Sequence, residues 1–125
     1  MNLIYLIALI LNGHVVNLVR QIDTVPVANK ANIQEWYGGT MIYAHDFLAG
    51  AEFYNLDMDE DVEAIYSDGS VSKFEVVEKG VYFIGSKWET ALFTYSKVGH
   101  LTLITCWGND RLMVELQPVY DGWRR

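Results

Sequence analysis

Hydrophobic and polar residues alternate over short distances along most of the chain, and small clusters of turn-forming residues separate these runs. Short runs rich in Val, Ile, Leu and Tyr that are bounded by Gly, Asn, Asp or Ser are typical of β-strands. The pattern predicts eight strands, at residues 3–11, 14–19, 40–44, 62–66, 71–77, 80–84, 100–106 and 111–117. Turns are expected between them at residues 12–13, 38–39, 67–70 and 107–110. The "SDGS" turn is a strong hairpin signal because Asp-Gly supplies the positive φ that a tight turn needs.

Two further segments are expected to form short helices, residues 29–36 and 86–95. In the second segment Ser86 is followed three residues later by Glu89, which is the pattern of a capping box. Many short strands at close spacing favour a closed or nearly closed barrel over a layered α/β arrangement. The sequence therefore predicts an all-β fold with one or two short helices, built as a single domain over residues 1–125.

The chain begins with the apolar run "MNLIYLIALIL", for which three interpretations are open: a buried strand, the remnant of a membrane anchor, or a signal segment. The run is too short to cross a bilayer as a helix. It lacks the positive flank and the small-residue cleavage site of a signal peptide. Its Ile and Leu content favours the strand, and no membrane anchor is evident.

Composition and charge narrow the choice of partners. The chain has 125 residues, a formal net charge of -7 and no cluster of Lys or Arg. Phosphate binding normally needs basic side chains, so nucleic acid is not expected as a partner. The chain has one cysteine, Cys106, which rules out an internal disulfide.

That cysteine ends the strand pattern "LTLITC", which "WGND" connects to a second strand pattern, "RLMVEL". A four-residue loop makes Cys106 and Arg111 a directly opposed pair on one face of the hairpin. A slip of one residue would place the two on opposite faces. One face is expected to be core and the other a partly polar groove. The core face would hold Leu101, Leu103, Thr105, Leu112, Val114 and Leu116, and the groove face Thr102, Ile104, Cys106, Arg111, Met113 and Glu115.

A cation beside a cysteine favours the thiolate, which is the reactive species. A cysteine nucleophile usually also needs a base or an imidazolium partner. His100 lies on the same strand as Cys106 but about 20 Å away along it, so it is excluded as that partner. His14 and His45 both remain, and strand geometry alone does not choose between them.

Three motifs bear on the choice because they resemble a known family. "TLITC" resembles the TLxTC signature of the sortases, and "RLMVEL" resembles the Arg-led strand that follows it. "IYAHDFLAGAEFYNL" is similar to the sortase histidine segment, in which a G-x-x-F-x-x-L pattern follows the histidine. The positions of that pattern are Gly50, Phe53 and Leu56. The resemblance covers residues 40–117 and selects His45.

The resemblance implies an eight-stranded β-barrel and a cysteine transpeptidase that cleaves a sorting-signal peptide and transfers the acyl group to an amine. Cys106 would be the nucleophile, His45 the general acid, and Arg111 the group that orients the substrate and stabilises the oxyanion. Candidates for lining the substrate groove are Ile104, Thr105 and Trp107. The partners would be a peptide with a sorting motif and an amine acceptor, at the cell surface.

Two alternatives remain beside the transpeptidase. One is a catalytically inactive barrel that binds a peptide or another partner. The other is a cysteine peptidase, in which water resolves the thioester.

The acidic stretch "DMDEDVEAIYSD" is the only candidate for a metal site, and no other cofactor is expected. Asp57, Asp59 and Asp61 follow the spacing that opens an EF-hand loop. However, Val62 stands at the sixth position and Asp68 at the twelfth, where that loop has Gly and Glu. A solvated acidic turn is the favoured interpretation. A weak Ca²⁺ site is the alternative, because the turn resembles some sortases in which acidic residues bind Ca²⁺.

Overall fold

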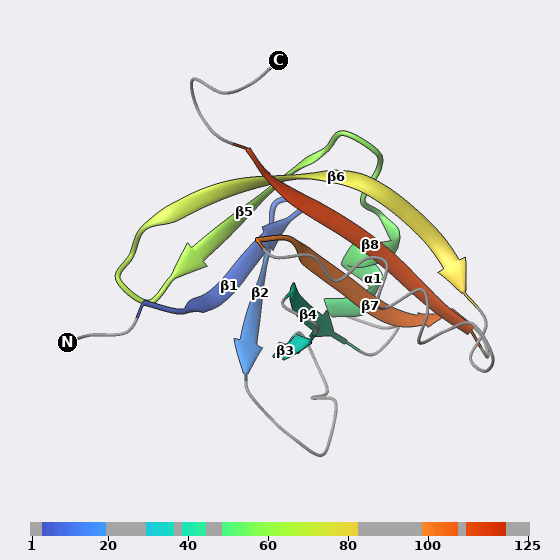
Figure 1. Cartoon of the computed structure of the whole chain (residues 1–125), viewed down its shortest axis with the longest axis horizontal. Coiled ribbons are helices and arrows are strands. Elements are labelled where there is room, and N and C mark those ends of the chain that lie inside the picture. The colour runs from blue at the N-terminus through green and yellow to red at the C-terminus, as the bar shows by residue number, and fades with distance from the viewer. Residues whose placement is uncertain are drawn as a thin grey trace.

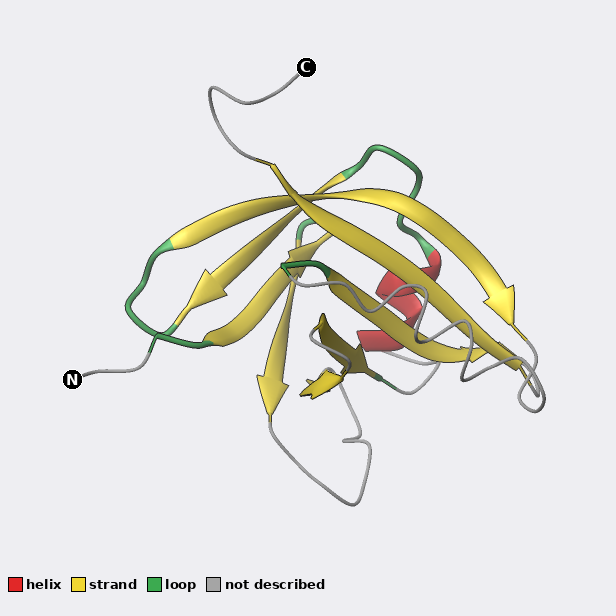
Figure 2. Ribbon diagram, viewed as in Figure 1, coloured by secondary structure: helices red, strands yellow, loops and turns green. Residues whose placement is uncertain are grey.

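A computed structural model describes residues 4–19, 30–36, 39–44, 49–82, 99–107 and 110–119. Within these ranges the chain forms eight strands and one short helix (Figures 1 and 2). The elements in chain order are β1 (Leu6–Leu11), β2 (His14–Val19), β3 (Lys30–Trp36), β4 (Gly39–Tyr43), α1 (Ala49–Tyr54), β5 (Asp61–Tyr66), β6 (Val71–Tyr82), β7 (Leu101–Trp107) and β8 (Asp110–Val119).

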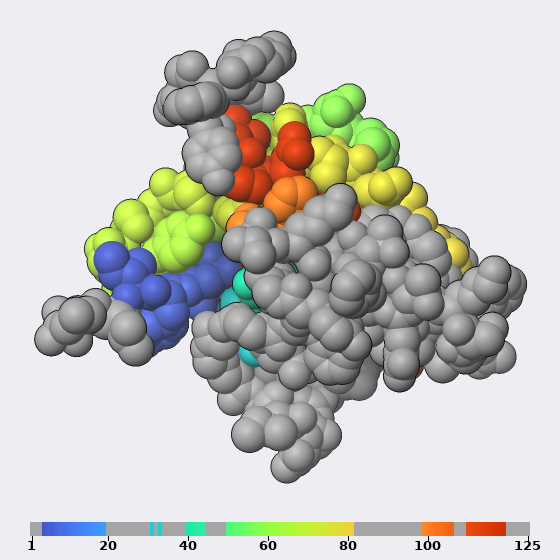
Figure 3. All heavy atoms as spheres, in the orientation of Figure 1, coloured from blue at the N-terminus to red at the C-terminus, as the bar shows by residue number. Residues whose placement is uncertain are grey.

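The strands form one closed barrel in the order β1-β2-β3-β4-β7-β8-β6-β5. Pairing between β1 and β5 closes it, and β1 and β5 lie side by side on the face seen in Figure 3, as do β7 and β8. Two pairs, β2–β3 and β4–β7, are parallel, and the others are antiparallel. The expected all-β barrel with a short helix is therefore confirmed.

Strand periodicity explains where the core lies. Alternate side chains of a strand point to opposite faces, and one set in each strand is buried inside the barrel. In β5, for example, Val62 and Ala64 are buried, whereas Asp61 is exposed. The N-terminal run follows the same rule, since β1 buries Leu9 and Leu11 in the common core. Of the three interpretations of that run, the buried strand is correct for residues 6–11. In the described residues no helix is long and apolar enough to cross a membrane.

Two of the four predicted turns have the backbone conformation that their sequences favour. Asn12 and Gly13 join β1 to β2 with φ angles of 52° and 80°, the pair of positive values that a type I′ hairpin requires. Gly69 has a φ of 86° in the β5–β6 turn, where the backbone N–H groups of Tyr66 and Gly69 donate to Ser70 and Tyr66 respectively. Local sequence thus sets two of the hairpins that build the barrel.

The structure corrects three of the expected elements. Residues 30–36, expected within a helix over 29–36, form strand β3 between β2 and β4. The separate strands expected at 71–77 and 80–84 are one strand to residue 82, with a register shift between Val76 and Glu78. Helix α1 was not expected. The helix expected at 86–95 and residues 83–84 lie outside the described residues.

Candidate functional site

The β7–β8 hairpin has the register that the sequence predicts, with Cys106 opposite Arg111. Trp107 and Asp110 also pair, so two residues rather than four separate the strands. Because the loop shortens by one residue on each side, the pairing of the cysteine and the arginine does not change. Their side chains lie on the same outer face of the barrel, and both are partly exposed.

The two faces of this hairpin differ less in burial than expected. The inner face is core, as predicted, and contains Leu101, Leu103, Leu112, Val114 and Leu116. The outer face was expected to be a partly polar groove, but Thr102, Ile104, Met113 and Glu115 on it are all buried. This expectation is therefore wrong for most of the length of the strands. The outer face is partly exposed at its Cys106–Arg111 end and again at its other end, at His100 and Gln117.

The candidate groove residues occupy different places. Ile104 is on the outer face but only 1% exposed. Thr105 points to the inner face and is 2% exposed, so its side chain does not line an outer groove. Its hydroxyl has no hydrogen-bond partner among the described residues. For Trp107 the structure describes the backbone, which belongs to β7.

Tyr43 is a site residue that the sequence reasoning missed. It pairs with Ile104 in the parallel β4–β7 ladder, so it lies on the same outer face as Cys106. Burial raises the pKa of Tyr43 to about 12, and the positive charge of Arg111 acts in the opposite direction. The phenol is therefore a neutral hydrogen-bond donor near the Arg111 guanidinium at physiological pH. Its position two residues before His45 was the available signal.

Helix α1 reaches the other side of the cysteine. The Tyr54 hydroxyl donates a hydrogen bond to the backbone carbonyl of Cys106. Gly50 and Phe53 are buried, and residues three apart fall on the same face of a helix. Leu56, two residues beyond the end of α1, is buried as well. The motif that suggested the histidine segment thus packs α1 and the residues that follow it onto the core.

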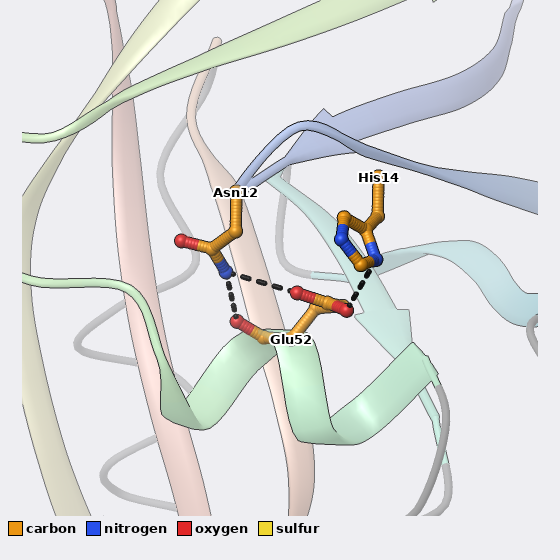
Figure 4. A network of polar contacts seen from close by, with 3 residues as sticks. All are labelled: Asn12, His14 and Glu52. Atoms are coloured by element: carbon orange, nitrogen blue, oxygen red, sulfur yellow. Dashed lines mark hydrogen bonds and ion pairs between the residues drawn. The ribbon is translucent and has the colours of Figure 1, made fainter.

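Polar contacts with two parts of the barrel hold the C-terminal half of α1. The Lys79 ammonium donates to the carbonyl oxygens of Tyr54 and Leu56 at 2.7 and 2.8 Å. Glu52 accepts from the Asn12 side chain at 3.1 Å and contacts Nδ1 of His14 at 3.0 Å (Figure 4). The β1–β2 turn and strand β6 thus hold the helix that carries Tyr54.

The three histidines have separate positions. His45, the predicted general acid, lies outside the described residues. His14 is 68% exposed and faces Glu52, so its structural role is at α1. His100 lies before β7, at the far end of that strand from Cys106, and its ring contacts the buried carboxylate of Glu115.

The acidic turn before β5 carries Asp57, Asp59 and the first residue of β5, Asp61, and all three are exposed. The backbone N–H of Asp57 donates to Glu60 at 3.1 Å. Across the parts of the chain that the structure describes, no group of three or more His, Cys, Asp or Glu side chains is arranged to hold a metal ion. Calcium binding at this turn stays a prediction.

A cavity of about 520 Å³ lies at the opposite end of the barrel from Cys106. Tyr5, Tyr66, Phe74 and His100 contribute to its lining, together with residues at the start of β4 and β7. The cysteine stands near the end of β7, roughly 20 Å along the strand. This cavity is thus separate from the candidate site.

No protein-family model and no curated protein matches the sequence. Solved structures do match the fold. The lid mutant of sortase A from Corynebacterium diphtheriae aligns with a TM-score of 0.70 at 16% identity, over 90% of this chain and 69% of that one. Sortase C from Clostridium perfringens with the C-terminal cell wall sorting motif gives 0.61 at 14%, over 90% and 69%. Sortase C1 from Streptococcus agalactiae gives 0.66 at 14%, over 90% and 66%.

These likenesses extend over nearly the whole of this chain and about two thirds of each sortase. They agree with the closed barrel and with the motifs that resemble the sortases. The protein has a sortase fold.

Proposed function

We propose that the protein is a sortase-like cysteine transpeptidase with Cys106 as its nucleophile. The observation that carries the proposal is the pairing of Cys106 with Arg111 at the partly exposed end of the hairpin in a sortase-fold barrel. The cation favours the thiolate. The same cation can stabilise negative charge that develops on a substrate oxygen beside the sulfur.

The reaction proceeds in two steps. Cys106 Sγ attacks a peptide carbonyl carbon, and Arg111 stabilises the resulting oxyanion. The carbon–nitrogen bond then breaks, and His45 gives a proton to the departing amine. In the second step the nitrogen of an acceptor amine attacks the thioester and loses a proton to His45, the carbon–sulfur bond breaks, and the thiolate is released. Two easier steps replace one difficult amide exchange.

The substrate class follows from the same likeness. One of the similar structures is a sortase C with a C-terminal cell wall sorting motif, so a peptide that carries such a motif is the substrate to test. The acceptor is a primary amine, which the second step requires.

The test combines a panel of sorting-signal peptides with an amine acceptor and follows products by mass spectrometry. We expect a thioester adduct on the wild-type protein and none on Cys106→Ala. Arg111→Ala should reduce turnover by about 10²–10³, the cost of removing an oxyanion donor. Arg111→Lys keeps the charge and is the matched control. Full turnover by Cys106→Ala would disprove the assignment.

The buried outer face of β7 and β8 gives some weight to a second candidate, a barrel that binds a partner without catalysis. In that case Cys106 should react with a thiol reagent no faster than free cysteine, and His45→Ala should not change the rate. Peptide cleavage that is independent of added amine would instead indicate a cysteine peptidase.

A further inference from the structure

We propose that Tyr54 is a positioning residue for the cysteine: its hydroxyl fixes the peptide group that follows Cys106 and thereby holds the sulfur beside Arg111. The proposal rests on the function proposed above, and it assigns a role to an unspecified position of the G-x-x-F-x-x-L pattern. Tyr54 acts through the backbone of Cys106.

The contact lies where the strand ladder stops. Strand β4 ends at Tyr43, and the next backbone N–H, that of Ala44, donates to the carbonyl of Ile104 at 3.0 Å. Backbone carbonyls two residues apart in a strand point to the same edge, so the carbonyl of Cys106 faces this edge as well. The Tyr54 hydroxyl supplies the donor there. A side chain from α1 thus continues the pattern of hydrogen bonds to the point where the nucleophile lies.

The donor is held in place before any substrate binds. Tyr54 packs against the hydrophobic core, so its ring has little freedom. Lys79 binds the carbonyl of the last residue of α1 and that of Leu56 just beyond it, and Glu52 links the helix to Asn12 and His14 (Figure 4). The hydroxyl therefore belongs to a helix that is fixed from two sides, and this is the arrangement that a positioning role requires.

A fixed carbonyl restricts the ψ angle of Cys106 and, through it, the direction of the Cα–Cβ bond. Reactions at a bound carbonyl are sensitive to small errors in the position of the attacking atom. A neutral hydrogen bond contributes on the order of 1 kcal/mol, so its loss should slow the reaction of the sulfur roughly three- to tenfold. Binding of the peptide should not change, because Tyr54 contacts the enzyme backbone.

The test compares Tyr54→Phe with Tyr66→Phe. Tyr66 is a matched control because it also packs on the core and its hydroxyl bonds a polar group, Ser72 Oγ, at 2.9 Å, yet it lies on β5, away from the cysteine. Cys106 is the only cysteine, so cysteine labelled with ¹³C at the carbonyl reports on this one hydrogen bond. The other readouts are the alkylation rate with iodoacetamide and the kcat and KM of thioester formation.

We expect Tyr54→Phe to shift the ¹³C carbonyl resonance, to slow alkylation three- to tenfold, and to lower kcat with KM unchanged. Tyr66→Phe should leave all three unchanged even if it lowers stability. A shifted resonance with unchanged reactivity would overturn the proposal, because the bond would then be structural only. Equal effects of both variants would overturn it too. If the wild type forms no thioester, the proposed function fails, and the resonance and the alkylation rates still decide the role of Tyr54.

Discussion

Tyr43 offers a test of the electrostatics around Arg111. Burial raises the pKa of its phenol from 10.0 to about 12. A group whose pKa is higher in the folded state stabilises the fold below its unfolded pKa, and this contribution is lost as the pH rises through the folded value. Tyr43 should therefore destabilise the barrel as the pH rises from 10 to 12.

Ultraviolet titration at alkaline pH, followed on the wild type and on Tyr43→Phe, measures this. The variant should lack one phenol with a midpoint near 12, and its stability should fall less between pH 10 and 12. If the missing phenol titrates near 10 instead, burial does not raise the pKa of Tyr43, and the partly buried position of its side chain is wrong.

Thr105 allows a test of how much a buried hydroxyl without a hydrogen-bond partner lowers the stability of the fold. Its Oγ1 is buried without a hydrogen-bond partner in the described structure. A buried polar group without a partner costs about 1–3 kcal/mol, and valine has nearly the same shape. Thr105→Val should thus raise the free energy of unfolding, by up to about 1 kcal/mol.

Thr102 on the same strand is the matched control. It is equally buried but has an interaction partner, so Thr102→Val should lower the free energy of unfolding by about 1 kcal/mol. Chemical denaturation of both variants gives the comparison. A loss of stability in Thr105→Val would mean that its hydroxyl is paired after all.

At the scale of single residues, the sequence predicted the pairing of Cys106 with Arg111 but not the contact of Tyr54 with Cys106. The face shared by Cys106 and Arg111 follows from strand alternation and the length of one loop, which are both local properties. Tyr54 could not be predicted in this way. Its contact spans 52 positions and depends on how α1 packs against the barrel.

Among the elements, the β5–β6 hairpin depends on one glycine. Gly69 has a φ of 86°, and a Cβ at this position would meet nothing within 4 Å. The cost of Gly69→Ala is therefore conformational, about 1 kcal/mol. Gly69→Asn should cost less, because Asn tolerates the left-handed region. Thermal unfolding of the two variants measures the order, and an equal loss in both would indicate a steric cause.

The wrong helix at 29–36 shows where element prediction fails. In β3 Ala31 and Ile33 are both buried and lie two residues apart, which fits a strand period, but the run is short and its sequence includes Gln34 and Glu35. Pairing with β2 on one side and β4 on the other decides the conformation. Strand propensity depends on neighbouring strands more than helix propensity does. The sequence of a short run therefore does not by itself determine whether it forms a strand.

For the molecule as a whole, the strand pattern predicted a barrel but not the order in which the strands pair around it. The hairpins β1–β2, β5–β6 and β7–β8 follow from turns of two to four residues. The β4–β7, β6–β8 and β1–β5 pairs join segments that are distant in the sequence. Long-range pairs have no local signal, so the resemblance to the sortases predicted a barrel of eight strands but the order of the strands was not predicted.

Closure of the barrel depends on β1, which pairs with both β2 and β5. Leu9, at the middle of this strand, has no exposed surface and stands opposite Val16 on one side and Ala64 on the other. Leu9→Ala removes apolar contacts from both seams and leaves a cavity, which should cost about 2–5 kcal/mol. A domain of this size has a total stability of about 5–15 kcal/mol.

Val15→Ala on β2 is the control for Leu9→Ala, because Val15 is 48% exposed and lies in the same β1–β2 ladder. It should cost no more than about 0.5 kcal/mol. Urea denaturation should give both values with similar m-values if the barrel unfolds as one unit. A small loss for Leu9→Ala would mean that β1 contributes little to the core. The β1–β5 seam would then open without unfolding the rest, and the Asn12 and His14 contacts that hold α1 near Cys106 would open with it.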